Sequence, residues 1–387
     1  MRLASSLLAL AGLLLVTAGG VLARARDGHE VERGPGSLRA VLVSPDQVTP
    51  AALQRFRREG SNAVVVSLAD NQRRAAASAV ARIKKAGLDL YYWIEVGRNP
   101  AMAEAHPQWM ASLQGHPEWR RHFPHTPQPA AGEVVKNYPW VPVHYREAFD
   151  AHLLRVKTLL HEMPVAKGIF LNDLQAAPSA CGCGNTFCRW VPDYGPLRTA
   201  TQLPPDAAAR LVAAVQTLSP KAEMIPVWTT ECEEHESASG QACAGVPCFG
   251  GSCWYAWTEQ LMPLARESKT IAALVPYRSF QRDQPRYGAP AGWIKTAIAA
   301  YAEMPPKRKG TAITPERMVT VLQGWDVTPE QRQAQIDRTR EAGTRGYVVA
   351  EMKIEQGWEP RIIKAQPIAK PNAPASPHTG HPHQAPR

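Results

Sequence analysis

Among the carboxyl groups of this chain, that of Asp173 has the sequence surroundings that most suggest a catalytic role. It ends the run Gly168-Ile-Phe-Leu-Asn172-Asp173, in which four of the first five residues are apolar or glycine and no charge intervenes. Such a run is typical of a strand that is buried on both faces of a parallel sheet. Catalytic groups of (β/α)8 barrels lie at the carboxyl ends of their strands, so we predict that Asp173 is a catalytic carboxylate. The competing interpretation is that Asp173 only caps the turn that follows.

Cleavage of a glycosidic bond needs a second carboxyl group in a different environment, so that one acts as acid and the other as nucleophile or base. Two more acids follow predicted strands: Glu351 ends the run Tyr347–Glu351, and Glu231 follows the run Glu223–Thr229. We predict that Asp173 is the nucleophile or charge stabiliser and that Glu351 or Glu231 is the general acid. Lys353 could instead neutralise Glu351, and the acidic cluster around Glu231 is typical of a solvated loop.

Further polar and aromatic residues lie at the ends of the predicted strands. Aromatic rings offer flat apolar faces to sugars, and the chain has 11 Trp against 7 Phe, which favours a sugar-stacking surface over simple core filling. Arg278 could bind an acidic sugar or hold a carboxylate ionised. Glu95 could simply pair with Arg98, and Asp326 could only lead into the next helix. The predicted substrate-binding residues are Asn172, Glu95, Trp93, Trp228, Tyr277, Arg278, Trp325, Asp326, His106 and Trp109.

The last two of these residues lie in a stretch from Val96 to Tyr145 that is rich in Pro, His and Trp and has no clear period. The pattern His-Pro-x-Trp occurs there twice, at His106 and at His116. We predict a long irregular insertion after the third strand that covers the site and offers His106 and Trp109 to a sugar. Ordinary packing of an irregular loop is the competing interpretation.

Strands that alternate with helices are predicted to position these groups. The eight strands are 39–43, 63–68, 88–95, 168–173, 223–229, 270–277, 317–324 and 346–351, and the helices are 49–60, 71–86, 146–163, 205–218, 253–267, 292–304 and 328–342. This rhythm is typical of an α/β protein with a (β/α)8 TIM barrel. A doubly wound open sheet would bring a glycine-rich phosphate loop after the first strand, and Ser44–Thr49 holds no glycine. The last helix is predicted to be weak, because only 358–364 can supply it.

Composition predicts three further segments around the barrel domain, which spans 37–368. Residues 1–25 have the basic start, the apolar run and the small-residue cleavage site of a secretory signal peptide, and a polar linker follows over 26–36. The tail over 369–387 is mainly Pro, Ala and His and is expected to be disordered. We therefore expect a secreted or periplasmic protein without stable membrane insertion, with an uncleaved N-terminal anchor as the alternative. The oligomeric state stays open.

Charge and cysteine content narrow the expected partners. The formal net charge is +10, but the basic residues are scattered and no nucleic-acid-binding motif is present, so we predict no nucleic-acid partner. All 7 Cys lie between Cys181 and Cys253, which in an oxidising compartment predicts disulfides and no cofactor. A zinc site is the alternative, with Cys181, Cys183, Cys188 and Cys232 as ligands. The expected partner is a carbohydrate, neutral or acidic.

Two stretches resemble a group of known proteins. Gly168–Asp173 with the following Cys181-x-Cys183-x4-Cys188 is similar to the Gly-Ile-x-Leu-Asp-Asp and Cys-x-Cys segments of uncharacterised bacterial glycoside-hydrolase-like barrels. Ala105–Met110 resembles the His-Pro-Glu-Trp element of that group. The resemblance implies a (β/α)8 fold with Asp173 as nucleophile, because the acid that ends the fourth strand has this role in alpha-amylases and alpha-galactosidases. Asn172 stands where the group has another acid.

These patterns predict a secreted glycoside-hydrolase-like protein that cleaves a poly- or oligosaccharide by a two-carboxylate mechanism. Asn172 keeps a second hypothesis open, a catalytically inactive glycan-binding or envelope protein on a degenerate barrel. A metal-dependent polysaccharide deacetylase ranks last, because the predicted strand ends are poor in His. Carboxyl groups about 5–5.5 Å apart would indicate a retaining enzyme, and about 6.5–9.5 Å an inverting one.

Overall fold

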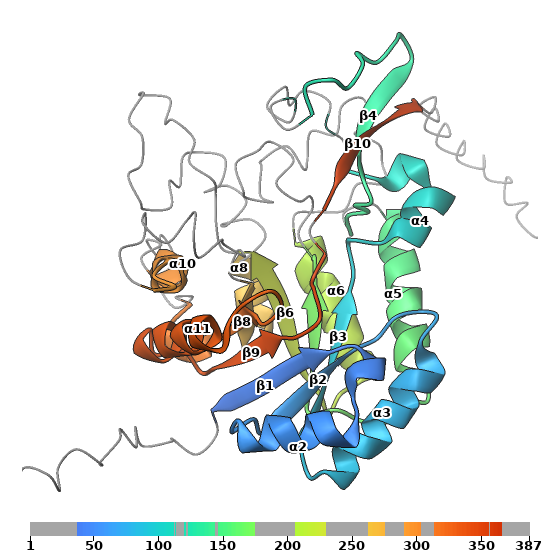
Figure 1. The fold of residues 1–387 in the computed structure, drawn as a ribbon. Coiled ribbons are helices and arrows are strands. Elements are labelled where there is room, and N and C mark those ends of the chain that lie inside the picture. The colour runs from blue at the N-terminus through green and yellow to red at the C-terminus, as the bar shows by residue number, and fades with distance from the viewer. Residues whose placement is uncertain are drawn as a thin grey trace, which may run out of the picture. The chain divides into compact units, whose positions relative to one another are not determined.

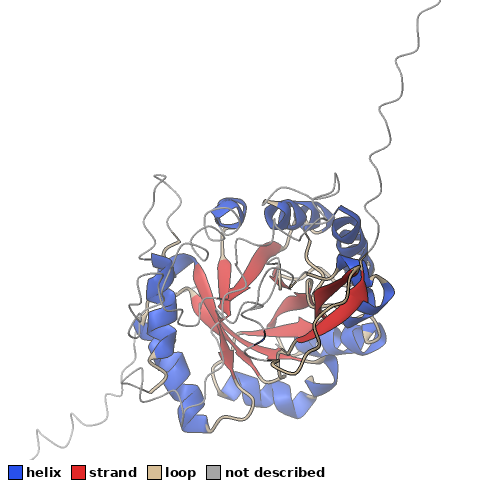
Figure 2. Cartoon of the chain, turned by 90° about the horizontal axis from the view of Figure 1, so that it is seen from above, coloured by secondary structure: helices blue, strands red, loops and turns tan. Residues whose placement is uncertain are grey.

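The computed structural model describes residues 37–111, 113, 120, 123–143, 146–174, 206–229, 262–274, 290–302, 313–355 and 357–365. Within them, eight parallel strands close into a barrel, and helices surround this ring (Figure 1, Figure 2). The predicted (β/α)8 barrel is therefore confirmed. In barrel order the strands are β1 (Leu38–Val43), β2 (Ala63–Ser67), β3 (Asp89–Glu95), β5 (Gly168–Asn172), β6 (Glu223–Thr229), β7 (Ile271–Leu274), β8 (Met318–Gln323) and β9 (Gly346–Ala350).

The helices begin where the sequence provides start signals. Thr49 caps α2 by accepting a hydrogen bond from the backbone N–H of Ala52 at 3.1 Å, and Pro50 takes the first helical position. Thr328 and Gln331 form a capping box at the start of α11. Among the described residues, no helix is long and apolar enough to cross a membrane. The helices are α2 (Pro50–Arg58), α3 (Arg73–Lys85), α4 (Pro100–Ala105), α5 (Arg146–Leu160), α6 (Ala207–Leu218), α8 (Met262–Glu267), α10 (Trp293–Ala302) and α11 (Pro329–Glu341), with short 3-10 turns η1 (Pro45–Gln47), η2 (Pro107–Trp109) and η7 (Pro315–Arg317).

Side chains along each strand alternate between the barrel interior and the layer under the helices. On β3, Trp93 belongs to the apolar cluster that fills the barrel, whereas Tyr92 and Ile94 belong to the cluster between strands and helices. On β9, Val348 and Ala350 fill the barrel in the same way. This phase decides which residues at the carboxyl ends of the strands face the mouth of the barrel.

The segment after β3 is more regular than predicted, because it contains α4, η2 and the strand β4 (Glu133–Tyr138). β4 pairs in antiparallel register with β10 (Glu359–Lys364), so the short last helix predicted over 358–364 is wrong. Ile362 packs with the cluster around Leu113, and Ile363 packs with the cluster around Met110. Ile362 and Ile363 are adjacent but pack into different clusters, as expected for a strand whose successive side chains point to opposite faces. Figure 1 shows this β4–β10 pair, which we call the two-stranded arm, beyond the end of the barrel toward which β3 points.

Charged side chains tie the arm to its surroundings. Arg361 donates to Glu104 of α4 at 2.6 Å, and its guanidinium lies 3.2 Å from the ring centroid of Tyr138. On β4, the buried Lys136 donates from Nζ to the carbonyl oxygens of Gln108 at 3.0 Å and Met110 at 2.9 Å. Burial lowers the pKa of Lys136 to about 8. The arm therefore fixes the backbone at η2, which carries Trp109.

Candidate active site

The carboxyl ends of β3 and β5 bring two predicted site residues together. Glu95 is the register partner of Asn172 in the parallel pair of these strands. Trp93 lies two residues before Glu95, and Phe170 lies two residues before Asn172. Both side chains fill the barrel, and their rings stack with centroids 5.9 Å apart. Since side chains alternate, Glu95 and Asn172 also point inward, at the mouth of the barrel.

Two donors orient the carboxylate of Glu95. Trp93 donates from Nε1 to Oε1 at 2.6 Å, and Asn172 donates from Nδ2 to Oε2 at 2.7 Å. Trp93 is fully buried and Glu95 is half-buried, so a rigid indole holds a carboxylate that remains partly open to the mouth. An acid at position 172 would place a like charge against Glu95, where Asn172 now donates a hydrogen bond.

Asp173 is buried next to this carboxylate. Its φ of 57° interrupts the strand alternation, and 5% of the residue is exposed. Burial, followed by the charge of Glu95 and a hydrogen bond with its side chain, raises the pKa of Asp173 well above its usual value, while the Arg98 guanidinium acts in the opposite direction. Asp173 therefore keeps its proton to a higher pH than an exposed aspartate does. Its Oδ2 atom is buried and has no hydrogen-bond partner within the described part of the chain.

The side chains of Asp173 and Glu95 interact, and this interaction contributes to the raised pKa of Asp173. A carboxyl group this deeply buried is poorly placed to attack a sugar. The geometry thus argues against the nucleophile role predicted for Asp173 and directs attention to Glu95.

The backbone beside Asp173 leaves no room for a side chain at position 97. The N–H of Gly97 donates to the carbonyl oxygen of Asp173 at 3.1 Å, and the N–H of Val96 donates to that of Asn172 at 3.0 Å. A Cβ atom at position 97 would lie 2.3 Å from the Asp173 carbonyl oxygen. Glycine therefore allows the segment after β3 to hold Asp173 in place.

Gly97→Ala is expected to lower the free energy of unfolding by about 1–3 kcal/mol, the usual cost of an extra methyl group in a tightly packed place. Urea unfolding followed by tryptophan fluorescence measures this quantity. Gly357→Ala is the matched control, because a Cβ atom there meets nothing within 4 Å. It should leave stability within about 0.5 kcal/mol of the wild type. Equal stability of the two variants would contradict the close approach at Gly97.

Glu351 lies on the outer side of the barrel. Its carboxylate accepts hydrogen bonds from Arg55 of α2 at 2.7 and 2.6 Å and from Arg332 of α11 at 3.2 Å. Glu351 lies just after β9 and two residues after Val349, so it points to the same side as Val349, which packs under the helices. This placement argues against the general-acid role predicted for Glu351 and indicates that it joins α2 to α11.

Glu351→Gln is expected to destabilise the fold without changing the activity of the folded protein. The amide group of glutamine would face guanidinium donors with its own donor, so we expect a loss of about 1.5–3 kcal/mol, the range for hydrogen bonds to charged groups. Chemical unfolding gives the free energy, and an assay well below the melting temperature gives the activity. A stable variant without activity would return Glu351 to the active site.

The other predicted site residues are distributed over several elements. Trp325 packs against the barrel-filling cluster, and Asp326 follows it with a φ of 53° before α11. His106 and Trp109 stack on each other with ring centroids 3.8 Å apart, close to the arm. Trp228 belongs to β6, and its side chain is outside the described part of the structure. Also outside are Glu231, Tyr277, Arg278 and all cysteines, including the alternative zinc ligands Cys181, Cys183, Cys188 and Cys232.

Sequence reasoning missed Gly97 as a site residue and considered Arg98 only as a partner of Glu95. Both lie just after Glu95, the last residue of β3, and this Gly-Arg pair is the signal that could have pointed to them. The structure brings Gly97 against the Asp173 backbone and Arg98 close enough to influence the Asp173 side chain. Within the described ranges, no group of three or more His, Cys, Asp or Glu side chains could hold a metal ion.

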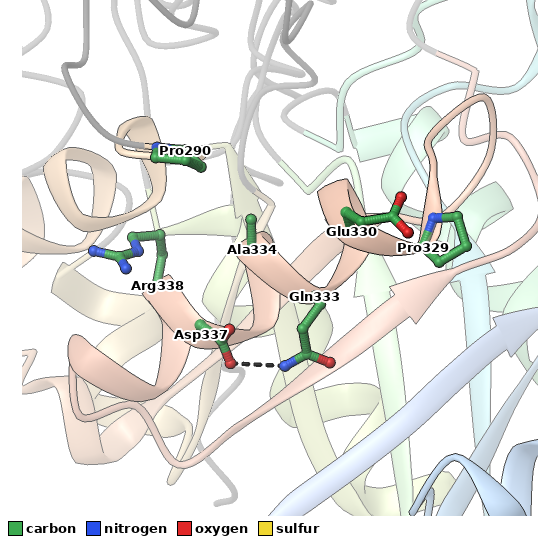
Figure 3. Close-up of a pocket in the computed structure, with 7 residues that line it drawn as sticks. All are labelled: Pro290, Pro329, Glu330, Gln333, Ala334, Asp337 and Arg338. Carbon is green, nitrogen blue, oxygen red and sulfur yellow. Dashed lines mark hydrogen bonds between the residues drawn. The ribbon is translucent and has the colours of Figure 1, made fainter.

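A pocket of about 520 Å³ lies apart from the acid pair, on α11 in the helix layer (Figure 3). Gln333 donates to Asp337 at 2.7 Å along one wall. None of the lining residues belongs to a strand end, so the pocket is not part of the candidate active site. They are Pro290, Pro329, Glu330, Gln333, Ala334, Asp337 and Arg338.

Comparison with protein-family models and with curated proteins gives no match. Among solved structures, the chain is similar to the beta-galactosidase from Rahnella sp. R3, with a TM-score of 0.46 and 12% identity over 84% of this chain and 52% of that one. It is also similar to the endo-1,4-beta-D-mannanase from Thermotoga petrophila RKU-1, with a TM-score of 0.43 and 11% identity over 81% and 88%. Tryptophan synthase from M. tuberculosis gives a TM-score of 0.34 and 11% identity over 82% and 84%. Likeness at this level carries no argument, so the assignment of function rests on the acid pair.

Proposed function

We propose that this protein is an exported glycoside hydrolase that cleaves glycosidic bonds in a poly- or oligosaccharide. The observation that carries the proposal is the acid pair of Glu95 and Asp173 at the mouth of the barrel. Glu95 is oriented by two donors and is half-buried. The pKa of the neighbouring Asp173 is raised, which favours its protonated form. A carboxyl pair with one protonated member can supply a proton to a leaving oxygen.

In the proposed reaction Glu95 is the catalytic carboxyl group and Asp173 is a positioning residue. Glu95 receives the proton that the pair shares and donates it to the glycosidic oxygen. The bond from that oxygen to the anomeric carbon then breaks, and the bonding electrons stay with the oxygen. A second carboxylate, for which Glu231 after β6 is our candidate, stabilises the positive charge on the sugar. Water adds to the anomeric carbon, and its proton returns to the acid pair.

Polar and aromatic side chains around the mouth support a carbohydrate as the substrate. Ser67 and Gln323 have the inward phase of Val65 and Val321, which fill the barrel below them. Their hydroxyl and amide groups can pair with sugar hydroxyls, and Trp325 packs against the same cluster. We assign substrate binding to these three residues, and we keep Trp228, Tyr277 and Arg278 as further candidates.

A glycan-binding protein without catalytic activity is the second candidate function. Both oxygens of Glu95 already accept hydrogen bonds, from Trp93 and from Asn172. A carboxylate held in this way is also suited to bind sugar hydroxyls through charge-assisted hydrogen bonds without breaking a bond. Asn172, at the position where the resembling barrels have an acid, also favours this candidate.

Measurement of reducing ends released from a broad polysaccharide panel, acidic glycans included, tests the proposed function. Release by the mature protein supports the hydrolase. Binding to one of the glycans without release supports the second candidate. Neither release nor binding across the panel would contradict both.

We further propose that residues 1–25 are removed on export and that the mature protein needs no cofactor. The mass of protein recovered from the periplasm or the medium should correspond to a chain that begins at Arg26. Metal analysis of the same sample tests zinc. One zinc ion per chain would contradict the absence of a cofactor and favour the cysteine site.

A further inference from the structure

Arg98 differs from the other half-buried arginines of the described chain. Its Nε is buried without a hydrogen-bond partner, and its guanidinium makes no hydrogen bond or ion pair with the described residues. An N–H group that is withdrawn from water without an acceptor is unfavourable, so the position of the Arg98 Nε suits an anion. Arg82 also has a buried Nε without a partner, but its guanidinium donates to the Ser78 hydroxyl at 3.0 Å. The remaining half-buried arginines each donate to a carboxylate or a carbonyl oxygen: Arg39, Arg55, Arg120, Arg155, Arg317, Arg332, Arg338, Arg345 and Arg361.

The backbone on both sides of Arg98 is held in place. The N–H of Gly97 donates to Asp173 at 3.1 Å, and the N–H of Asn99 donates to Pro139 at 3.0 Å. Asn99 also caps α4 through its side chain, which accepts from Met102 N–H at 3.0 Å. The start of the side chain is therefore fixed before a ligand arrives, which reduces the entropy lost on binding.

Arg98 is also close to the acid pair. It follows Glu95 at the carboxyl end of β3, and its positive charge acts on the carboxyl group of Asp173. Within the described part of the chain the guanidinium nevertheless forms no ion pair with either acid, and the carboxylate of Glu95 accepts from Trp93 and Asn172 instead. The positive charge of Arg98 is thus left for an incoming group.

We infer that Arg98 is an anion-binding subsite and that the carbohydrate bound there carries a carboxylate, as in a uronic acid. The nature of the ligand rests on the proposed function. A guanidinium binds a carboxylate through two parallel hydrogen bonds. One carboxylate neutralises one guanidinium, whereas a doubly charged phosphate would leave an excess negative charge beside Glu95. The net charge of +10 also favours the approach of an acidic polymer.

Calorimetric titration of the mature protein with galacturonate, glucuronate and mannuronate trimers tests the subsite. The methyl ester of each trimer is the matched neutral ligand, because it differs only at the carboxyl group. The wild type should bind one of the acids about 10–100-fold more tightly than its ester, as expected for hydrogen bonds to a charged group. Arg98→Gln should lose this preference and keep its affinity for the ester. Arg98→Lys should retain part of it, because an ammonium lacks the planar fork.

Arg58→Gln is the control, because it removes an exposed guanidinium from α2 and should leave the preference unchanged. Melting curves show whether each variant is folded. The inference is overturned if the wild type has no preference for any acid over its ester, if folded Arg98→Gln keeps the preference, or if inorganic phosphate binds more tightly than every acid trimer.

Hydrolysis measured on the same trimers separates this inference from the proposed function. An acid preference that depends on Arg98, without cleavage, supports the subsite and contradicts the hydrolase. Cleavage of esters and acids alike, without a preference in binding, supports the hydrolase and overturns the subsite.

Discussion

Glu95→Gln is expected to reduce the rate of glycosidic bond cleavage by about 10²–10⁴-fold, the usual contribution of a positioned acid or base. Glutamine cannot pass a proton between Asp173 and the leaving oxygen. Its amide also replaces one acceptor by a donor, which would face either the indole N–H of Trp93 or the amide of Asn172. The loss should appear in kcat at saturating substrate, because the group acts on the bond that breaks.

Glu104→Gln provides the matched control for this experiment. Glu104 lies on α4, its side chain is 60% exposed, and it pairs with Arg361 of the arm. Its replacement should leave kcat unchanged. Wild-type kcat in folded Glu95→Gln protein would remove Glu95 from the reaction and leave the glycan-binding candidate in its place.

The second large effect concerns the dependence of stability on pH at Asp173. Its pKa is raised in the folded protein, chiefly by burial and then by Glu95. An acid with a raised folded pKa stabilises the fold most below its unfolded pKa, near 4, and this contribution falls as the pH rises toward the folded value. Each unit of pKa difference corresponds to about 1.4 kcal/mol.

Asp173→Asn should remove this pH dependence, because asparagine stays neutral and can still donate to Glu95. The variant is expected to match the wild type near pH 4 and to be more stable at pH 8, with loss of cleavage at both. Thermal melts at several pH values measure the difference. Asp46→Asn, at an exposed position, is the control and should follow the wild type. A wild-type pH dependence in Asp173→Asn would contradict the raised pKa.

The strands of the barrel could be predicted because their apolar runs are bounded by turn signals, but the phase of each strand could not. Tyr347-Val-Val-Ala350 has no polar residue that marks the outer face, so its sequence does not show which way Glu351 points. The barrel fixes the phase by placing Val348 and Ala350 inside. Glu351 therefore faces the helices, and this could be known only from the closed sheet.

Asp173 illustrates a second limit. The sequence places it at the end of the buried strand, as observed, but simple alternation cannot describe a residue with a φ of 57°. Asn172 takes the inward position, and Asp173 turns into the protein next to Glu95. The acid pair thus depends on a backbone conformation that Asp tolerates better than most residues and that its sequence context does not specify.

The arm could not be predicted because its two strands are far apart in the sequence. Glu359–Lys364 is a short segment with a Pro in its second position, and nothing near it marks a partner. The pairing with β4 becomes visible only in three dimensions, where Ile362 and Ile363 find apolar clusters on opposite faces. Tertiary contacts decide such segments more often than local preference does.

The same arm sets the time at which the mouth can be completed during synthesis. A chain leaves the ribosome with its N-terminus first, so β3, β4 and β5 emerge long before β10. Lys136 of β4 donates to the backbone next to Trp109, and Arg98 forms a bridge with Trp140, two residues after β4. β4 has its strand partner only when Lys364 has been made. A chain released early would contain Glu95, Asp173 and β4 but would lack the strand that pairs with β4. The mouth of the barrel would therefore reach its complete structure only after one of the last segments of the chain had been translated.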